Sequence, residues 1–332
     1  MSNIGNIEEQ AGLVDPQAQD NLYRGTSRRG LLGQALGAGL FATAGMWAAG
    51  CGGGGTDSVT NSPAIGTSPT ASPTATPTPR AVTEADVLNF ALNLEYLEAE
   101  YYLRGVTGTG LSTTDSGNAG TVTGGRQVTF ATDAVRQYFN EVATDELNHV
   151  RFLRSALGSN AVVRPNINFT DAFNAAAQAA GLGSSFDPFA NETNFLIGAF
   201  VFEDVGVTAY RGGSTLLTTP SVIQAAAGIL AVEAFHAGVV RSLLADQFTT
   251  GVGAANAISL LRAQAGGGKD ETINSGTITA GGANYAPTDA QGRTYSRTTA
   301  EVLRIVYLTP TGTPSSGGFF PSGMNGFIRT AS

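Results

Sequence analysis

Apolar residues recur at three- and four-residue spacing in four stretches of the chain, which is the pattern of helices with one buried face. The stretches cover residues 84–104, 133–157 and 191–212, and a fourth begins at residue 220. The fourth is the most regular, with inward positions from Val222 through Ile229 to Val240. Four such helices in succession predict an all-α fold, a four-helix bundle over residues 81–250.

Local signals mark the ends of these helices. Thr83, with Asp86 three residues later, is typical of a capped helix start. Thr219 followed by Pro220 combines an N-cap residue with a proline in the first helical position. Gly158 follows the second helix, where a glycine commonly ends one. We therefore expect separate helices with short or irregular connections.

Each of the four helices places a carboxylate within or beside its apolar stripe. These carboxylates belong to Glu95, Glu146, Glu203 and Glu233. Burying an unpaired carboxylate costs several kcal/mol, so four at similar depth need a compensating positive charge. A shared metal cation is the simplest source of that charge.

Both histidines of the chain follow a glutamate by three residues, His149 after Glu146 and His236 after Glu233. Residues three apart project from the same side of a helix, so each pair can reach one metal ion. Two such pairs, with one glutamate from each remaining helix, form the dinuclear pattern of carboxylate-bridged helical bundles. The plainer alternative is that the histidines form ordinary ion pairs along their helices.

The pattern predicts a site for two iron or manganese ions, because oxygen and imidazole donors do not choose sharply between these metals. The predicted ligands are Glu95, Glu146, His149, Glu203, Glu233 and His236. Glu98, one turn after Glu95 on nearly the same face, is the alternative ligand from the first helix. Glu146 and Glu233 are expected to bridge the metals.

Other polar residues on these helices are not expected to bind the metal ions directly. Glu100 and Glu141 are expected on solvated faces, and Asp145 and Asp204 can reach only a neighbouring helix. Three tyrosines point inward and are expected to be core residues rather than redox partners: Tyr102, Tyr138 and Tyr210.

Composition narrows the function further. The net charge is −8, with 18 Lys and Arg against 26 Asp and Glu, and no basic cluster exists to neutralise phosphates. This balance argues against nucleic-acid binding. The single cysteine, Cys51, excludes a disulfide framework and a cysteine-based metal site.

The first part of the chain has the order of an export signal. Arg28 and Arg29 stand directly before the uncharged apolar run 31–49, which indicates the twin-arginine route. The run leads into Ala48-Ala49-Gly50-Cys51, which resembles a lipobox with Ala48 in place of the usual leucine. Cys51 is therefore the predicted lipidation site, and an uncleaved run is long enough to anchor the chain by itself.

We thus expect a leader over residues 1–51 and a protein that is periplasmic or at the cell surface, held to a membrane. Residues 52–80 are almost entirely Gly, Ser, Thr, Pro and Ala and predict a disordered linker.

The run from Asn89 to Tyr102, the two Glu-x-x-His pairs and the Gly-Gly-Phe-Phe-Pro sequence at 317–321 resemble the ferritin-like domain family that includes the desiccation-related proteins of plants and their bacterial relatives. The resemblance covers nearly everything from residue 82 onward. It implies a ferritin-like bundle with the tail packed around it, and it implies no single activity. More distantly, the two pairs are similar to those of bacterioferritins and rubrerythrins, which activate oxygen.

Residues 251–332 are expected to form an extension of helices and loops on the bundle. Residues 254–265 predict a fifth helix and residues 299–308 a short last one, while the aromatic residues at 317–327 are expected to cover bundle surface. Three functions fit the whole: a di-metal oxidoreductase that oxidises ferrous iron or handles oxygen or peroxide, a non-catalytic stress-related metal-binding protein of the cell envelope, and a peroxide-disproportionating protein similar to manganese catalase.

Overall fold

The computed structural model describes residues 80–274 and 282–332. The expected leader, with Cys51, and all but the last residue of the expected linker lie outside the described residues. The fold below is that of residues 80–332 with the gap at 275–281.

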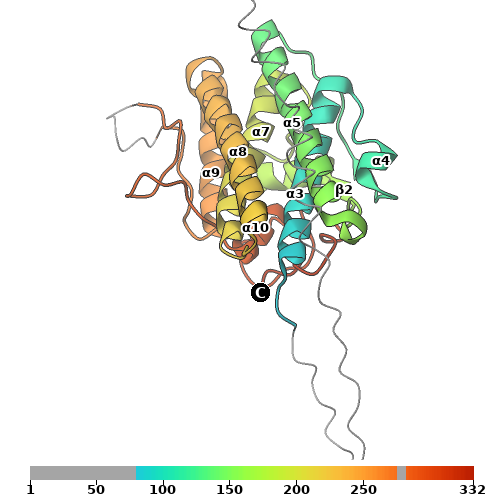
Figure 1. Cartoon of the computed structure of the whole chain (residues 1–332). Helices are drawn as coiled ribbons and strands as arrows, with labels where there is room; N and C mark the ends of the chain where they lie inside the picture. The colour runs from blue at the N-terminus through green and yellow to red at the C-terminus, as the bar shows by residue number, and fades with distance from the viewer. Residues whose placement is uncertain (1–79, 275–281) are drawn as a thin grey trace, which may run out of the picture. The chain divides into compact units, whose positions relative to one another are not determined.

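Four long helices form the bundle: α3 (Glu84–Thr107), α5 (Asp133–Leu157), α7 (Glu192–Ser214) and α8 (Pro220–Asp246). Helix α3 packs mainly on α5 and α7 mainly on α8, and the two pairs lie side by side (Figure 1). The all-α bundle expected from the sequence is confirmed. The bounds of α5 are those predicted, whereas α3 continues one turn past the predicted end at 104.

The start of α3 follows from its cap. The side chain of Thr83 accepts a hydrogen bond from the backbone N–H of Asp86, and the Asp86 carboxylate accepts one from the backbone N–H of Thr83, at 3.3 Å and 2.9 Å. This reciprocal cap satisfies donors that the first turn of a helix leaves free. The helix ends at Gly108, which adopts the left-handed conformation that glycine accepts at low cost.

The connections contain short elements that the sequence pattern did not predict. They are α4 (Thr113–Ser116), β1 (Val122–Thr123), η1 (Gly158–Asn160), β2 (Ile167–Asn168) and α6 (Phe169–Ala179). Strands β1 and β2 pair in parallel. Helix α6 was not predicted, although its buried residues follow the spacing of one helix face: Phe169, Ala172, Phe173, Ala176 and Ala177.

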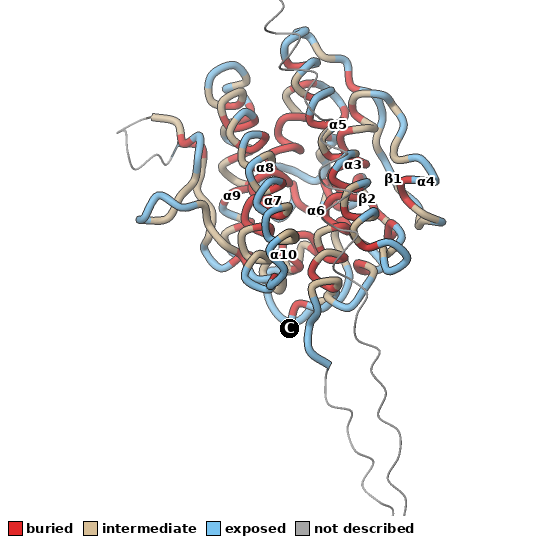
Figure 2. Tube along the Cα trace, in the orientation of Figure 1, coloured by how far each residue is buried: buried red, intermediate tan, exposed pale blue. Residues whose placement is uncertain are grey.

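The segment after α8 adds η2 (Thr249–Gly251), α9 (Val252–Ala265) and α10 (Thr299–Val306). Helices α9 and α10 contact α7 and one another. Every residue of α7 from Phe195 to Tyr210 is therefore buried. Figure 2 shows that buried residues gather on the inner sides of the helices. The expected coverage of the bundle by the aromatic tail is also observed, since Phe319 and Phe320 are buried and Phe319 packs edge-on against Phe173.

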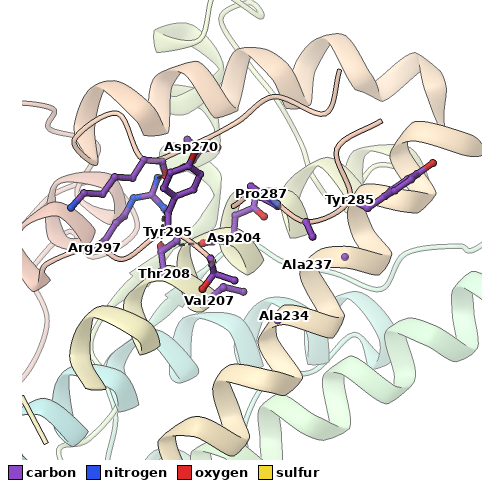
Figure 3. Close-up of a pocket in the computed structure, with 14 residues that line it drawn as sticks. Asp204, Val207, Thr208, Ala234, Ala237, Asp270, Tyr285, Pro287, Tyr295 and Arg297 are labelled. Atoms are coloured by element: carbon purple, nitrogen blue, oxygen red, sulfur yellow. Dashed lines mark hydrogen bonds and ion pairs between the residues drawn. The ribbon is translucent and has the colours of Figure 1, made fainter. Parts of the chain in front are cut away.

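A buried ion network joins the extension to the bundle. Asp204 of α7 pairs with Arg241 of α8 at 2.8 Å and with Arg262 of α9 at 2.6 Å. Asp270 in turn pairs with Arg262 and with Arg297, each at 2.9 Å. Asp204, Asp270 and Arg297 border a cavity of about 50 Å³ between α7, α8 and the extension (Figure 3). The expectation that Asp204 reaches only neighbouring helices is confirmed.

Among the described residues, α8 is the one helix long and apolar enough to cross a membrane, by length and composition alone. A core helix of a globular protein passes the same test. Here α8 packs on α7 and has Glu233 and His236 buried on its inner face.

Candidate metal centre

The six predicted ligands converge in the middle of the bundle. Their exposed fractions range from 0% to 7%. They form two groups, and within each group the ligand atoms lie within 4.8 Å of one another. The first group is Glu95, Glu146, His149 and Glu233, and the second is Glu146, Glu203 and His236. The helices place them there because each ligand lies on the inward stripe of its helix.

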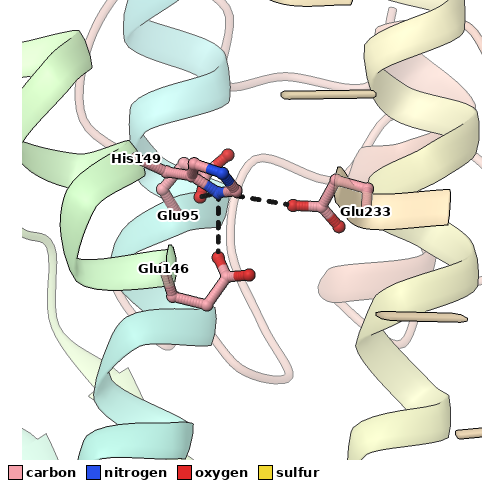
Figure 4. A group of neighbouring side chains, drawn as sticks. All are labelled: Glu95, Glu146, His149 and Glu233. Carbon is pink, nitrogen blue, oxygen red and sulfur yellow. Dashed lines mark hydrogen bonds and ion pairs between the residues drawn. The ribbon is translucent and has the colours of Figure 1, made fainter. Parts of the chain in front are cut away.

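The first group draws on three helices and surrounds one imidazole (Figure 4). Nδ1 of His149 lies 3.2 Å from Glu95 Oε2, 3.5 Å from Glu146 Oε2 and 3.8 Å from Glu233 Oε1. The structure thus places Glu95, rather than its alternative Glu98, against His149.

The second group is built around the other histidine. Nδ1 of His236 lies 3.2 Å from Glu146 Oε1 and 3.5 Å from Glu203 Oε2. Its second ring nitrogen, Nε2, lies 3.5 Å from Asp145 of α5. A carboxylate at this position can orient the ring so that Nδ1 faces the centre.

Glu146 is the one side chain common to both groups, with one oxygen toward each histidine. Glu233, the other expected bridge, belongs to the first group only. The arrangement has the form of two adjacent binding positions that share a carboxylate.

Several atoms of these side chains are buried without a hydrogen-bond partner among the described residues. They are both carboxylate oxygens of Glu146, both of Glu233, one oxygen of Glu203 and Nδ1 of His236. Unpaired buried polar atoms are costly and rare in folded proteins. Oxygen and imidazole donors that converge in this way fit a bound metal cation, which would satisfy them.

Burial and mutual repulsion shift the protonation of the centre. Burial, and after it the charge of Glu98, raises the pKa of Glu233 well above its usual value. Burial raises the pKa of Glu95 to about 7, against the opposing charge of His149. Burial disfavours the charged form of His149, yet Glu95 and Glu146 raise its pKa to about 12. Without metal, protons therefore take the place of the missing positive charge.

Tyrosines support the ligands at two places. Tyr102 of α3 donates a hydrogen bond to Glu203 of α7, and Tyr210 of α7 donates one to Glu95 of α3. Each bond joins two helices and holds a carboxylate by one oxygen. These tyrosines were expected to be core residues; they are buried, and they also orient ligands.

One glutamate of α3, Glu100, behaves differently from expectation. Glu100 is buried rather than solvated, because it pairs with Arg104 at 2.8 Å and with Arg164. Arg164 lies in the connection after α5. The periodicity of the helices does not predict that a residue of this connection contacts α3. Glu141 is exposed, as expected.

Glu98 is a further buried carboxylate beside the centre. A Cβ atom on Gly206 of α7 would overlap Glu233 Oε2 and lie 3.3 Å from Glu98 Oε1, so both carboxylates converge over this glycine. Burial, and then the charge of Glu146, raises the pKa of Glu98 well above its usual value. The sequence shows a glutamate one turn from Glu95, but it does not show that both side chains enter the core.

Comparisons with known proteins agree with this geometry. The ferritin-like domain family matches residues 83–246. The chain is 30% identical over 173 residues to the desiccation-related protein PCC13-62 of Craterostigma plantagineum, which is 50% of this chain and 55% of that protein. It is 29% identical over 268 residues to the ferritin-like catalase Nec2 of Nesocodon mauritianus, which is 74% of this chain and 86% of that protein. With its helices, its buried carboxylates and this match, the segment 83–246 is a ferritin-like domain.

Proposed function

We propose that this protein binds two manganese or iron ions in the bundle and disproportionates hydrogen peroxide. The observation that carries the proposal is the pair of ligand groups sharing Glu146. The relative named as a ferritin-like catalase supports the choice of peroxide, because the similarity extends over 86% of that protein.

Peroxide disproportionation reduces one molecule to two waters and oxidises a second to dioxygen, with two electrons exchanged in each half-reaction. A bound pair of redox metals supplies and recovers those two electrons. The chain fixes the geometry: Glu146 spans the two positions, and Tyr102 and Tyr210 restrain the carboxylates of Glu203 and Glu95. Burial keeps bulk water from competing for the site.

Metal analysis tests the binding part of this proposal. We expect about two manganese or iron ions per chain in the wild type. Replacing Glu146 and His149 together, Glu146→Gln with His149→Gln, should abolish binding, because it removes ligands from both groups. Glu141→Gln on the exposed face of the same helix is the matched control and should leave the metal content unchanged. A double variant that retains its full metal load would refute the assigned ligands.

Oxygen evolution tests the catalytic part. We expect the metal-loaded protein to release dioxygen from peroxide, with one dioxygen for every two peroxides consumed. Aerobic oxidation of added ferrous iron, without oxygen release, would point instead to a ferroxidase. Inactivity toward both, at full metal occupancy, would favour a non-catalytic metal-binding protein.

We also propose that the protein is exported by the twin-arginine route and held to the membrane through Cys51. The basis is the sequence alone: Arg28 and Arg29 before an apolar run that ends at Cys51. Replacing both arginines with lysine should leave the protein in the cytoplasm. Cys51→Ala should remove any attached lipid, which mass spectrometry of the membrane fraction detects.

A further inference from the structure

The side of the centre at Glu98 opens on a small apolar cavity. The cavity measures about 20 Å³ and lies between α3 and α7, beneath α10 and the aromatic tail. Eight apolar side chains and Gly206 line it together with Glu98, and the apolar set includes Leu97, Val306 and Phe319. Glu98 is the one charged residue in this lining.

Glu98 connects this cavity to the proposed metal ligands. Glu98 borders the cavity, and its carboxylate approaches the point above Gly206 that Glu233 also reaches. Gly206 has no side chain, so the carboxylates of Glu233 and Glu98 can come together over it at the edge of the cavity. Alanine at this position would fill that point with a methyl group.

The lining restricts which ligand can enter. A volume of about 20 Å³ holds one molecule about the size of water or dioxygen, since a single water needs roughly 10–15 Å³. The apolar walls penalise an ion, because they offer it no compensating charge or hydrogen bond. A small uncharged molecule can rest against the apolar walls and meet the Glu98 carboxylate at one end.

From this geometry we infer that the cavity between α3, α7 and α10 is the binding site for the small uncharged oxidant, of the peroxide and dioxygen class, and that Glu98 holds it beside Glu233. The inference rests on the proposed function for the identity of the oxidant. The cavity itself is testable without metal or turnover.

Krypton provides that test. Crystals of the protein are pressurised with krypton, and the anomalous signal locates the bound atoms, because an apolar cavity of suitable size takes up noble gas. We expect a krypton atom among Leu97, Val306 and Phe319. Val306→Phe should fill the space and remove the signal. Absence of krypton from the wild-type cavity would overturn the inference.

Kinetics with peroxide provide a second test. Val306→Phe should lower kcat/KM about tenfold, since it obstructs the site without touching a proposed ligand. Ile258→Phe is the matched control, because Ile258 of α9 is a similarly buried aliphatic residue that does not line this cavity. It should change kcat/KM by about twofold or less. Equal effects of the two variants would overturn the inference.

Glu98→Leu separates binding from metal ligation. The variant should raise KM for peroxide several-fold, keep the metal content of the wild type and keep the krypton site. Loss of metal from this variant would show that Glu98 is a ligand and would overturn its assigned role. Wild-type protein without peroxide turnover would refute the proposed function, whereas active wild type with an unaffected Val306→Phe variant would refute only this inference.

Discussion

At the scale of single residues, the centre depends on one position that lacks a side chain. Gly206 lies three residues after Glu203 on α7, and two carboxylates occupy the space that a Cβ atom would need. A glycine inside a helix destabilises it by about 0.5–1 kcal/mol relative to alanine. The close approach of Glu233 and Glu98 accounts for its presence here.

Gly206→Ala should therefore lower metal binding and stability together, because its methyl group displaces Glu233. Gly228→Ala on α8 is the control, since a Cβ there would meet nothing within 4 Å. That control should be neutral or raise the free energy of unfolding by about 1 kcal/mol. Metal analysis and urea unfolding measure both effects, and a Gly206→Ala protein with normal metal content would contradict the explanation.

At the scale of helices, the packing of α7 depends on charge as well as on apolar contact. Asp204 is buried between Arg241 of α8 and Arg262 of α9, so one carboxylate ties three helices together. Burial alone would raise its pKa, but the two arginines lower the pKa of Asp204 to about 2. Its folded-state pKa thus lies below the ordinary value of 3.8.

Asp204→Asn should lower the free energy of unfolding by about 3–5 kcal/mol at neutral pH, because it leaves the buried Arg241 without a carboxylate partner, whereas Arg262 keeps its pair with Asp270. In the wild type, the contribution of Asp204 to the free energy of unfolding is complete above pH 3.8 and is lost as the pH falls toward about 2. The free energy of unfolding of the variant should therefore change less with pH over this acidic range. Asp187→Asn, in the exposed pair with Arg126, is the control and should cost about 1 kcal/mol or less. Similar losses from both variants would contradict the assignment.

At the scale of the whole molecule, the buried centre makes stability depend on metal and pH together. Without metal, the folded state holds protons that the unfolded chain would release, because the folded pKa values of Glu95 and His149 are raised from 4.5 to about 7 and from 6.5 to about 12. A raised folded-state pKa gives stability at low pH that is lost as pH rises.

Metal-free protein should consequently lose stability as the pH rises from about 5 to 9, and bound metal should remove this loss, since metal replaces the protons. Thermal unfolding of chelator-treated and metal-loaded protein at several pH values measures the difference. A metal-free protein that gains stability over this range would contradict the protonation described for Glu95 and His149.

Local sequence patterns specify the long helices and the candidate ligands on them. The three-and-four periodicity placed the four long helices to within about a turn, because an amphipathic helix repeats its buried face locally. The Glu-x-x-His spacing named His149 and His236 with their glutamates, because residues three apart necessarily share a helix face. These features are local, so a linear pattern contains them.

Tertiary structure decided what depends on contacts distant in the chain. Glu100 is buried by Arg164, and α7 is buried on all sides only because α9, α10 and the tail cover it. The approach of Glu98 and Glu233 over Gly206, and the cavity beside them, join three helices and the tail. No periodicity specifies such contacts, because a repeat along one helix fixes which face is buried but not which residue of another helix meets it.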